Sequence, residues 1–315
     1  MRYAKEDASQ ARVRTVRFRQ FALKMLLTVL WRMSRAFTKR TLEKLFFSPH
    51  AYRPTPSENL RLEAGRRFQV HVNGKAIQCW QLGDGPGILF VHGWNGRGIQ
   101  FHPFFDPLAA AGYSAVIFDA PAHGESQGRT TNGFEIAETV RALLNNDNGL
   151  DSGLNIKGII AHSLGASAVI MALSRQDSCP DAVLIAPPLK LKEILYGTFE
   201  HHGIPKDVYR SIIAEMEDAL GYTLEKDNPH LLVKDIKSEL LIVHDREDRT
   251  APYKDSEEVS KRCSNVTLHT TEGLGHRRIL ANRIVVDLAV SHFDRVLGES
   301  PTSRHSQAPK EKELK

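Results

Sequence analysis

The feature that most constrains the fold is an alternation of short apolar runs with helical stretches, which begins after about residue 67. Runs that are apolar at every position indicate strands buried on both faces, as in a parallel sheet covered by helices. We predict such strands at Ile88–Val91, Ala115–Phe118, Ile156–Ile160, Ala182–Ile185, Leu240–His244 and Val266–Thr270. The helices between them are predicted near Ile99–Ala111, Phe134–Leu144, Leu164–Ser174, Tyr253–Arg262 and Ala281–Val296.

Two further strands precede this series. Phe68–Val72 and Ala76–Leu82 flank Asn73-Gly74, a dipeptide typical of tight hairpin turns. The hairpin would give the sheet an antiparallel edge. The sequence therefore predicts an α/β fold with a mostly parallel, eight-stranded sheet.

Composition shifts and pattern breaks divide the chain into segments. Residues 1–57 are predicted to be a basic helical segment with a linker, and residues 58–298 a single α/β domain. Residues 187–236 interrupt the alternation and are predicted to form a helical cap, whereas the polar tail 299–315 is expected to be disordered. The expected cap helices are Leu189–Phe199, Lys206–Leu220 and Pro229–Val233.

The positive charge is confined to the N-terminal segment. Residues 1–50 hold twelve Lys and Arg against three Asp and Glu, or +9, and the whole chain carries +5, which leaves −4 for the rest. A nucleic-acid partner is therefore not expected. The three cysteines show no metal-ligand spacing, so no metal is expected, and they are interpreted as thiols in a reducing compartment, which favours a cytoplasmic protein.

One amphipathic helix is predicted from Val16 to about Phe47, followed by a linker over Ser48–Pro56. Its most apolar part, Phe21–Trp31, contains Lys24 and is too short to cross a bilayer, and no signal-peptide cleavage site follows it. Two interpretations stay open. The apolar face of residues 16–47 packs on the protein body or on a second subunit, or it lies on an anionic membrane surface, the inner face for a cytoplasmic protein.

Three chemically active residues follow predicted strands in the order Ser163, Asp248, His276. A serine needs a base to remove its proton, and that base needs a third group to fix its tautomer. Ser163 lies in a strand–turn–helix context, within A-H-S-L-G. This order and context are typical of a nucleophile elbow.

Alternatives exist for two of these positions. The literal G-x-S-x-G pattern surrounds Ser126, but that serine lies in a loop with no helix after it, whereas Ala161 replaces the first glycine at Ser163. Within H-D-R-E-D, Asp248 is preferred because the loop can turn it toward a histidine, with Asp245 and Glu247 as alternatives. An oxyanion hole is expected from two backbone N–H groups, those of Trp94 and Leu164.

Over about Phe68–Val296 the chain resembles the α/β-hydrolase superfamily, through H-G-W, D-A-P-A-H-G-E-S, A-H-S-L-G, H-D-R-E-D and G-L-G-H in that order. The resemblance implies an eight-stranded sheet with a helical cap and hydrolysis of carboxylic esters without a cofactor. It also explains Ser126 as a structural loop residue. Arg277-Arg278 depart from the pattern, as an outward-facing basic pair or as a site for an acidic substrate group.

The sequence thus predicts a serine carboxylesterase acting on small-molecule acyl esters. A thioesterase, an acyltransferase that excludes water, and a non-catalytic binding protein on the same fold are the alternatives.

Overall fold

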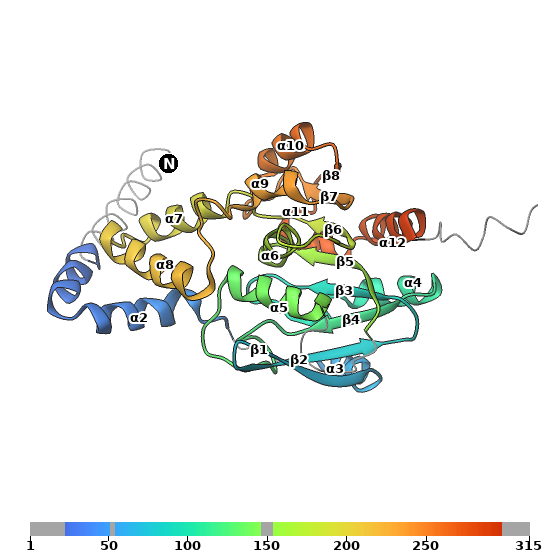
Figure 1. Cartoon of the computed structure of the whole chain (residues 1–315), viewed down its shortest axis with the longest axis horizontal. Helices are drawn as coiled ribbons and strands as arrows, with labels where there is room; N and C mark the ends of the chain where they lie inside the picture. The colour runs from blue at the N-terminus through green and yellow to red at the C-terminus, as the bar shows by residue number, and fades with distance from the viewer. Residues whose placement is uncertain (1–22, 51–53, 146–153, 298–315) are drawn as a thin grey trace, which may run out of the picture.

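The structure is a computed structural model that describes residues 23–50, 54–145 and 154–297. Its centre is one eight-stranded sheet in the order β1-β2-β4-β3-β5-β6-β7-β8 (Figure 1). The strands are β1 (Arg66–Val72), β2 (Lys75–Leu82), β3 (Gly87–Val91), β4 (Ser114–Phe118), β5 (Ile156–His162), β6 (Asp181–Ile185), β7 (Leu240–Asp245) and β8 (Val266–Thr271). All eight predicted strands are confirmed, as is the predicted α/β fold with a mostly parallel sheet.

The first two strands form the predicted antiparallel edge. Val72 pairs with Lys75 across the turn, where Asn73 and Gly74 both have positive φ angles of 50° and 75°. Both central residues of a type I′ turn need that conformation, and asparagine and glycine adopt it most easily. β2 then pairs antiparallel with β4, and the remaining neighbours pair in parallel.

Helices cover both faces of the sheet. In β3, Ile88 and Phe90 contribute to one hydrophobic core, and Leu89 and Val91 contribute to the other. The first core also receives side chains from α3, α4 and α12, whereas α5, α6 and α10 pack on the second. The bounds are α3 (Pro56–Glu63), α4 (His102–Ala110), α5 (Gly133–Asn145), α6 (Leu164–Leu173), α10 (Tyr253–Arg262) and α12 (Arg283–Leu297), with η1 (Gly98–Phe101), α11 (Gly275–Arg278) and η3 (Ile279–Ala281) as short turns.

The segment between β6 and β7 contains α7 (Leu191–His201), α8 (Lys206–Leu220), α9 (Pro229–Leu232) and η2 (Val233–Asp235). In Figure 1, α7 and α8 lie beside α2 (Arg35–Phe47), away from the sheet. Phe46 of α2 packs on Phe199 of α7 with 4.8 Å between ring centroids, and Lys39 forms an ion pair with Glu215 of α8. The N-terminal helix α2 therefore packs against the inserted helices α7 and α8.

The expectation of one continuous helix from Val16 to Phe47 is wrong in the described part. The first helix covers residues 23–33, and α2 starts anew at Arg35, because Ser34 is extended and its side chain accepts a hydrogen bond from the Phe37 N–H. Serine is a favoured N-cap, so it satisfies the start of a new helix and breaks the old one. Residues 16–22 and the tail 299–315 lie outside the described residues.

The predicted linker is also too long, because α3 starts at its last residue, Pro56. Thr55 and Glu58 form a capping box there, and proline at the first helical position has the right φ angle. Within the described ranges, no helix combines the length and the apolar character that a membrane crossing requires.

Candidate active site

The turn between β5 and α6 presents Ser163 at the carboxyl edge of the sheet. Its backbone has φ 54° and ψ −129°, a strained conformation for a residue other than glycine. The turn is tight because its neighbours are small: a Cβ added at Gly93 would lie 2.7 Å from the Cβ of Ser163, and one at Gly165 would collide with the Val91 and His92 carbonyl oxygens. Ala161, at the position of the missing glycine, is fully buried in β5 and leaves this geometry intact.

Two hydrogen bonds link the three residues that the sequence singled out. His276 Nε2 lies 2.8 Å from Ser163 Oγ, and His276 Nδ1 lies 2.7 Å from Asp248 Oδ2. With Nδ1–H donating to the carboxylate, Nε2 is left free to accept the serine proton. The structure therefore brings Ser163, His276 and Asp248 together in the arrangement of a nucleophile, base and acid.

The surroundings of Asp248 keep its carboxylate charged. Burial raises the pKa of Asp248, but hydrogen bonds from His244, His276 and the backbone N–H groups of Ala251 and Thr250 outweigh it and hold the pKa well below its usual range. His244 Nε2 lies 3.3 Å from Asp248 Oδ2, and its Nδ1 lies 2.7 Å from Ser256 Oγ. An anionic Asp248 can thus stabilise a positive charge on the neighbouring imidazole.

The alternative acid, Asp245, has different partners. Its carboxylate accepts hydrogen bonds from Thr271 Oγ1 at 2.8 Å and from the backbone N–H groups of Leu274 and Glu247 at 2.9 and 3.0 Å. These contacts hold the loop that carries His276 rather than the histidine side chain itself. Glu247, the other alternative, is exposed.

The literal motif serine is engaged elsewhere. Ser126 Oγ donates to the Asp119 carbonyl oxygen at 2.5 Å and accepts from the Gln78 N–H at 2.9 Å. Arg277 and Arg278 are both exposed, and Arg278 donates to the carbonyl oxygens of Gly273 and Leu274. The basic pair therefore faces outward.

The loop after β3 packs against the serine turn at Gly93 and continues with the Trp94 N–H, and Trp94 lines the same cavity as Ser163. Neither this N–H nor that of Leu164, at the first position of α6, has an acceptor among the residues that the structure describes. Asn95, with φ 55°, fixes the loop: its N–H donates to His123 Nε2 at 3.2 Å, and its Oδ1 accepts from the His50 N–H at 2.8 Å. Two unpaired donors beside a nucleophile are suited to a developing negative charge.

Three buried histidines, His92, His123 and His162, support these loops and are called the loop histidines. His92 Nε2 accepts from the Ala120 N–H at 2.9 Å, and His162 Nε2 donates to the carbonyl oxygen of His276 at 2.8 Å. Burial lowers the pKa of His92 and His123 to about 4 and that of His162 to about 3, so all three are neutral. Sequence reasoning gave none of them a role, although each lies within one of the recognised motifs.

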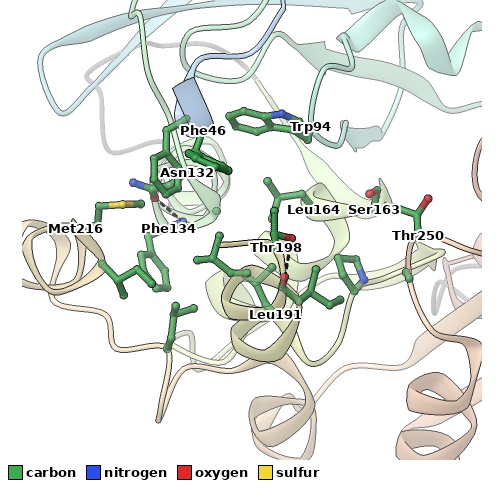
Figure 2. A pocket seen from close by; sticks show the side chains of 18 residues that line it. Phe46, Trp94, Asn132, Phe134, Ser163, Leu164, Leu191, Thr198, Met216 and Thr250 are labelled. Carbon is green, nitrogen blue, oxygen red and sulfur yellow. Dashed lines mark hydrogen bonds between the residues drawn. The ribbon is translucent and has the colours of Figure 1, made fainter. Parts of the chain in front are cut away.

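An apolar cavity of about 280 Å³ extends from Ser163. Figure 2 shows Ser163 and Thr250 at one end of its lining and Met216 and Phe134 at the other. The wall is built by α5, α6, the inserted helices α7 and α8, and the N-terminal helix α2, which contributes Phe46 and Phe47. The cavity thus provides an extended apolar space beside the Ser163 side chain.

No group of three or more His, Cys, Asp or Glu side chains suited to a metal ion occurs in the described part of the chain.

Comparison with known proteins finds a hydrolase family and solved esterase structures. The Alpha/beta hydrolase family matches residues 88–288. The esterase Pf2001 of Pyrococcus furiosus is 21% identical, with 80% of this chain and 97% of that chain covered and a TM-score of 0.57. Est1E of Butyrivibrio proteoclasticus, solved with ferulic acid bound, is 17% identical, with 75% and 98% covered and a TM-score of 0.55. A search of curated protein sequences found no match.

Proposed function

Because the chain belongs to the alpha/beta hydrolase family, we propose that it is a serine hydrolase that cleaves carboxylic esters through an acyl-enzyme intermediate. The observation that carries the proposal is the hydrogen-bonded series Ser163–His276–Asp248 at the end of an apolar cavity. The esterase Pf2001, similar in fold, is consistent with this reaction class.

In the acylation step, Ser163 Oγ attacks the ester carbonyl carbon while His276 Nε2 accepts the hydroxyl proton. The carbonyl oxygen becomes an oxyanion, which accepts hydrogen bonds from the Trp94 and Leu164 N–H groups. When the tetrahedral intermediate collapses, the bond to the alcohol oxygen breaks, and His276 donates its proton to that oxygen. The alcohol leaves, and the acyl group stays on Ser163.

Deacylation repeats these steps with water as the nucleophile. His276 accepts a proton from the water as its oxygen attacks the acyl carbon, and the same two N–H groups stabilise the oxyanion. Collapse releases the carboxylic acid, and the proton on His276 returns to Ser163 Oγ. Throughout, Asp248 keeps the imidazole in the Nδ1–H tautomer and stabilises its charged form.

The cavity supports an ester whose acyl part is apolar and extended. We assign residues 187–236 as a cap over the site, because Leu191 and Leu195 of α7 and Met216 of α8 line the cavity together with Ser163. The cavity volume of about 280 Å³ is just below the range for small-molecule pockets, about 300 to 1,000 Å³. Small to medium acyl groups fit this volume better than large ones.

The test compares two serines. Ser163→Ala should lower kcat/KM on acyl esters by about 10³-fold or more, because the nucleophile is gone. Ser126→Ala is the matched control and should keep turnover within about tenfold, because its hydroxyl bonds to Asp119 and Gln78 rather than to His276. A fluorophosphonate label should attach to Ser163 in the wild-type protein.

Mass mapping of that label to Ser126 would overturn the assignment. Full binding of ester without any turnover by the folded wild type would instead indicate a non-catalytic binding protein. Acyl transfer to an added alcohol or thiol in preference to water would identify an acyltransferase.

A further inference from the structure

The exposed large apolar side chains of the described residues are concentrated on the N-terminal helices. Ten such side chains occur in the described part of the chain, and seven of them lie between residues 23 and 45. They are Leu23, Met25, Leu26, Val29, Met33, Phe37 and Leu45. Exposed apolar side chains that are grouped on a protein surface typically mark an interaction site, whereas singly scattered ones do not.

Within the helix at residues 23–33, these side chains form a stripe. Met25, Val29 and Met33 follow one another at intervals of four residues, so they lie on one helix face, and they are 51%, 48% and 76% exposed. Leu27, from another face of the same helix, is only 6% exposed and joins the hydrophobic core. The helix is thus attached through one side and presents the stripe on the other.

The same two helices carry exposed positive charges. Five exposed cationic side chains have no ion-pair partner among the residues that the structure describes: Lys24, Arg32, Arg35, Arg40 and Lys44. Glu43 is the only acidic residue between positions 23 and 50. A surface that is both apolar and cationic is complementary to a bilayer with anionic headgroups.

A second copy of this chain is a poorer match for this surface. In a two-fold symmetric dimer the same patch meets itself. The five cations of one copy would then approach those of the other, and like charges at an interface are unfavourable.

The surface is also connected to the candidate active site. The C-terminal end of α2 places Phe46 and Phe47 in the wall of the cavity that contains Ser163. We propose that residues 23–45 dock the protein on an anionic lipid bilayer, and that its substrates are apolar esters dissolved in that bilayer. The assignment of bilayer esters as substrates rests on the proposed function, whereas docking on the bilayer does not.

The docking test uses the full chain and sedimentation with vesicles. Wild type should bind vesicles of phosphatidylcholine with phosphatidylserine at low salt and bind far less at high salt or to phosphatidylcholine alone, because salt screens the attraction. The variant M25E/V29E/M33E should lose about tenfold or more of this binding. The matched control L60E/L231E/I284E adds three negative charges at exposed apolar positions outside the two helices, and should bind nearly as wild type.

Several outcomes would overturn docking. One is wild type that ignores anionic vesicles at low salt, and another is equal loss of binding in the two triple variants. In a third outcome, the wild type is a dimer that does not bind vesicles, and M25E/V29E/M33E is a monomer. That result would assign the exposed apolar side chains to contact with a second copy.

Activity separates this inference from the proposed function. Both triple variants should hydrolyse a water-soluble short ester at wild-type rates, and Ser163→Ala should bind vesicles undiminished. If vesicles bind but no ester is turned over, docking stands and the hydrolase proposal fails. An ester embedded in vesicles should be cleaved faster on anionic than on neutral vesicles, with that advantage lost in M25E/V29E/M33E, and equal rates would overturn the bilayer as substrate source.

Discussion

Replacing Asp248 with asparagine changes one atom in the hydrogen-bond arrangement around His276. Asp248 Oδ1 accepts from the Thr250 and Ala251 N–H groups at 2.7 and 3.0 Å, so an asparagine will keep its carbonyl oxygen there. Its NH₂ group must then take the place of Oδ2, facing His276 Nδ1. Because an NH₂ group cannot accept a hydrogen bond, His276 will carry its proton on Nε2, where it can no longer take one from Ser163.

We therefore expect Asp248→Asn to lower kcat by about 10³ to 10⁴-fold, with little change in KM, because Asp248 is not among the residues that line the cavity. Steady-state kinetics on a short acyl ester measure the effect, and urea unfolding checks that the variant is folded.

Asp245→Asn is the control for this prediction. Asp245 bonds to Thr271, Leu274 and Glu247 and does not contact His276, so its replacement should lower stability by about 1 to 3 kcal/mol and turnover by less than about tenfold. If Asp245→Asn is the damaging change and Asp248→Asn is mild, the reasoning about the tautomer of His276 is refuted.

Two further predictions concern stability and chain length. Folding lowers the pKa of each loop histidine below the value of about 6.5 that a histidine has in the unfolded chain. Below about pH 6.5 the unfolded chain therefore binds more protons than the folded protein. The free energy of unfolding then decreases as the pH falls toward the folded pKa. Each of the three histidines should lower the free energy of unfolding by about 1.4 kcal/mol at about pH 5.5. Urea unfolding should therefore give a free energy about 4 kcal/mol lower at about pH 5.5 than at about pH 7.5. A free energy of unfolding that does not change between these pH values would contradict the burial of the histidines as neutral groups. Met216→Trp should fill the far end of the cavity and lower kcat/KM about tenfold or more for long acyl esters while sparing short ones, and an equal loss at every chain length would argue against this direction of the acyl group.

The sheet was predictable because its signals are local. A strand buried on both faces must be apolar at successive positions, and β3 shows this with Ile88 and Phe90 in one core and Leu89 and Val91 in the other. The order of the strands was not predictable in the same way. β4 lies between β2 and β3, a pairing between segments distant in sequence that periodicity does not encode.

The N-terminal helices show where local signals compete. The apolar periodicity runs through Ser34 without a break, and the capping hydrogen bond of that serine nevertheless ends one helix and starts the next. At Thr55-Pro56 the capping box is present in the sequence, whereas the surrounding prolines by themselves favour a linker. In both places, the capping side chain was a better guide than the pattern around it.

The candidate site was predictable only as far as its residues have distinctive neighbours in sequence. Strand–turn–helix context separated Ser163 from Ser126, and the structure places only Ser163 within hydrogen-bond distance of His276. The bond from His162 to the carbonyl oxygen of His276, 114 positions away, leaves no mark in the local sequence. The catalytic roles of these residues remain predictions that the serine and aspartate variants test.

Two residues of the cavity wall lie outside the part of the chain that matches the family. The family match spans residues 88–288, and Phe46 and Phe47 lie before it, yet both line the cavity with Ser163. α2 reaches this position through contacts of its own: Phe46 packs on Phe199, and the Phe47 carbonyl oxygen accepts from the Thr131 N–H at 2.9 Å. Part of the cavity wall therefore lies outside the matched region, so we expect the ester preference of the proposed hydrolase to follow the N-terminal segment of this chain as well as its matched core.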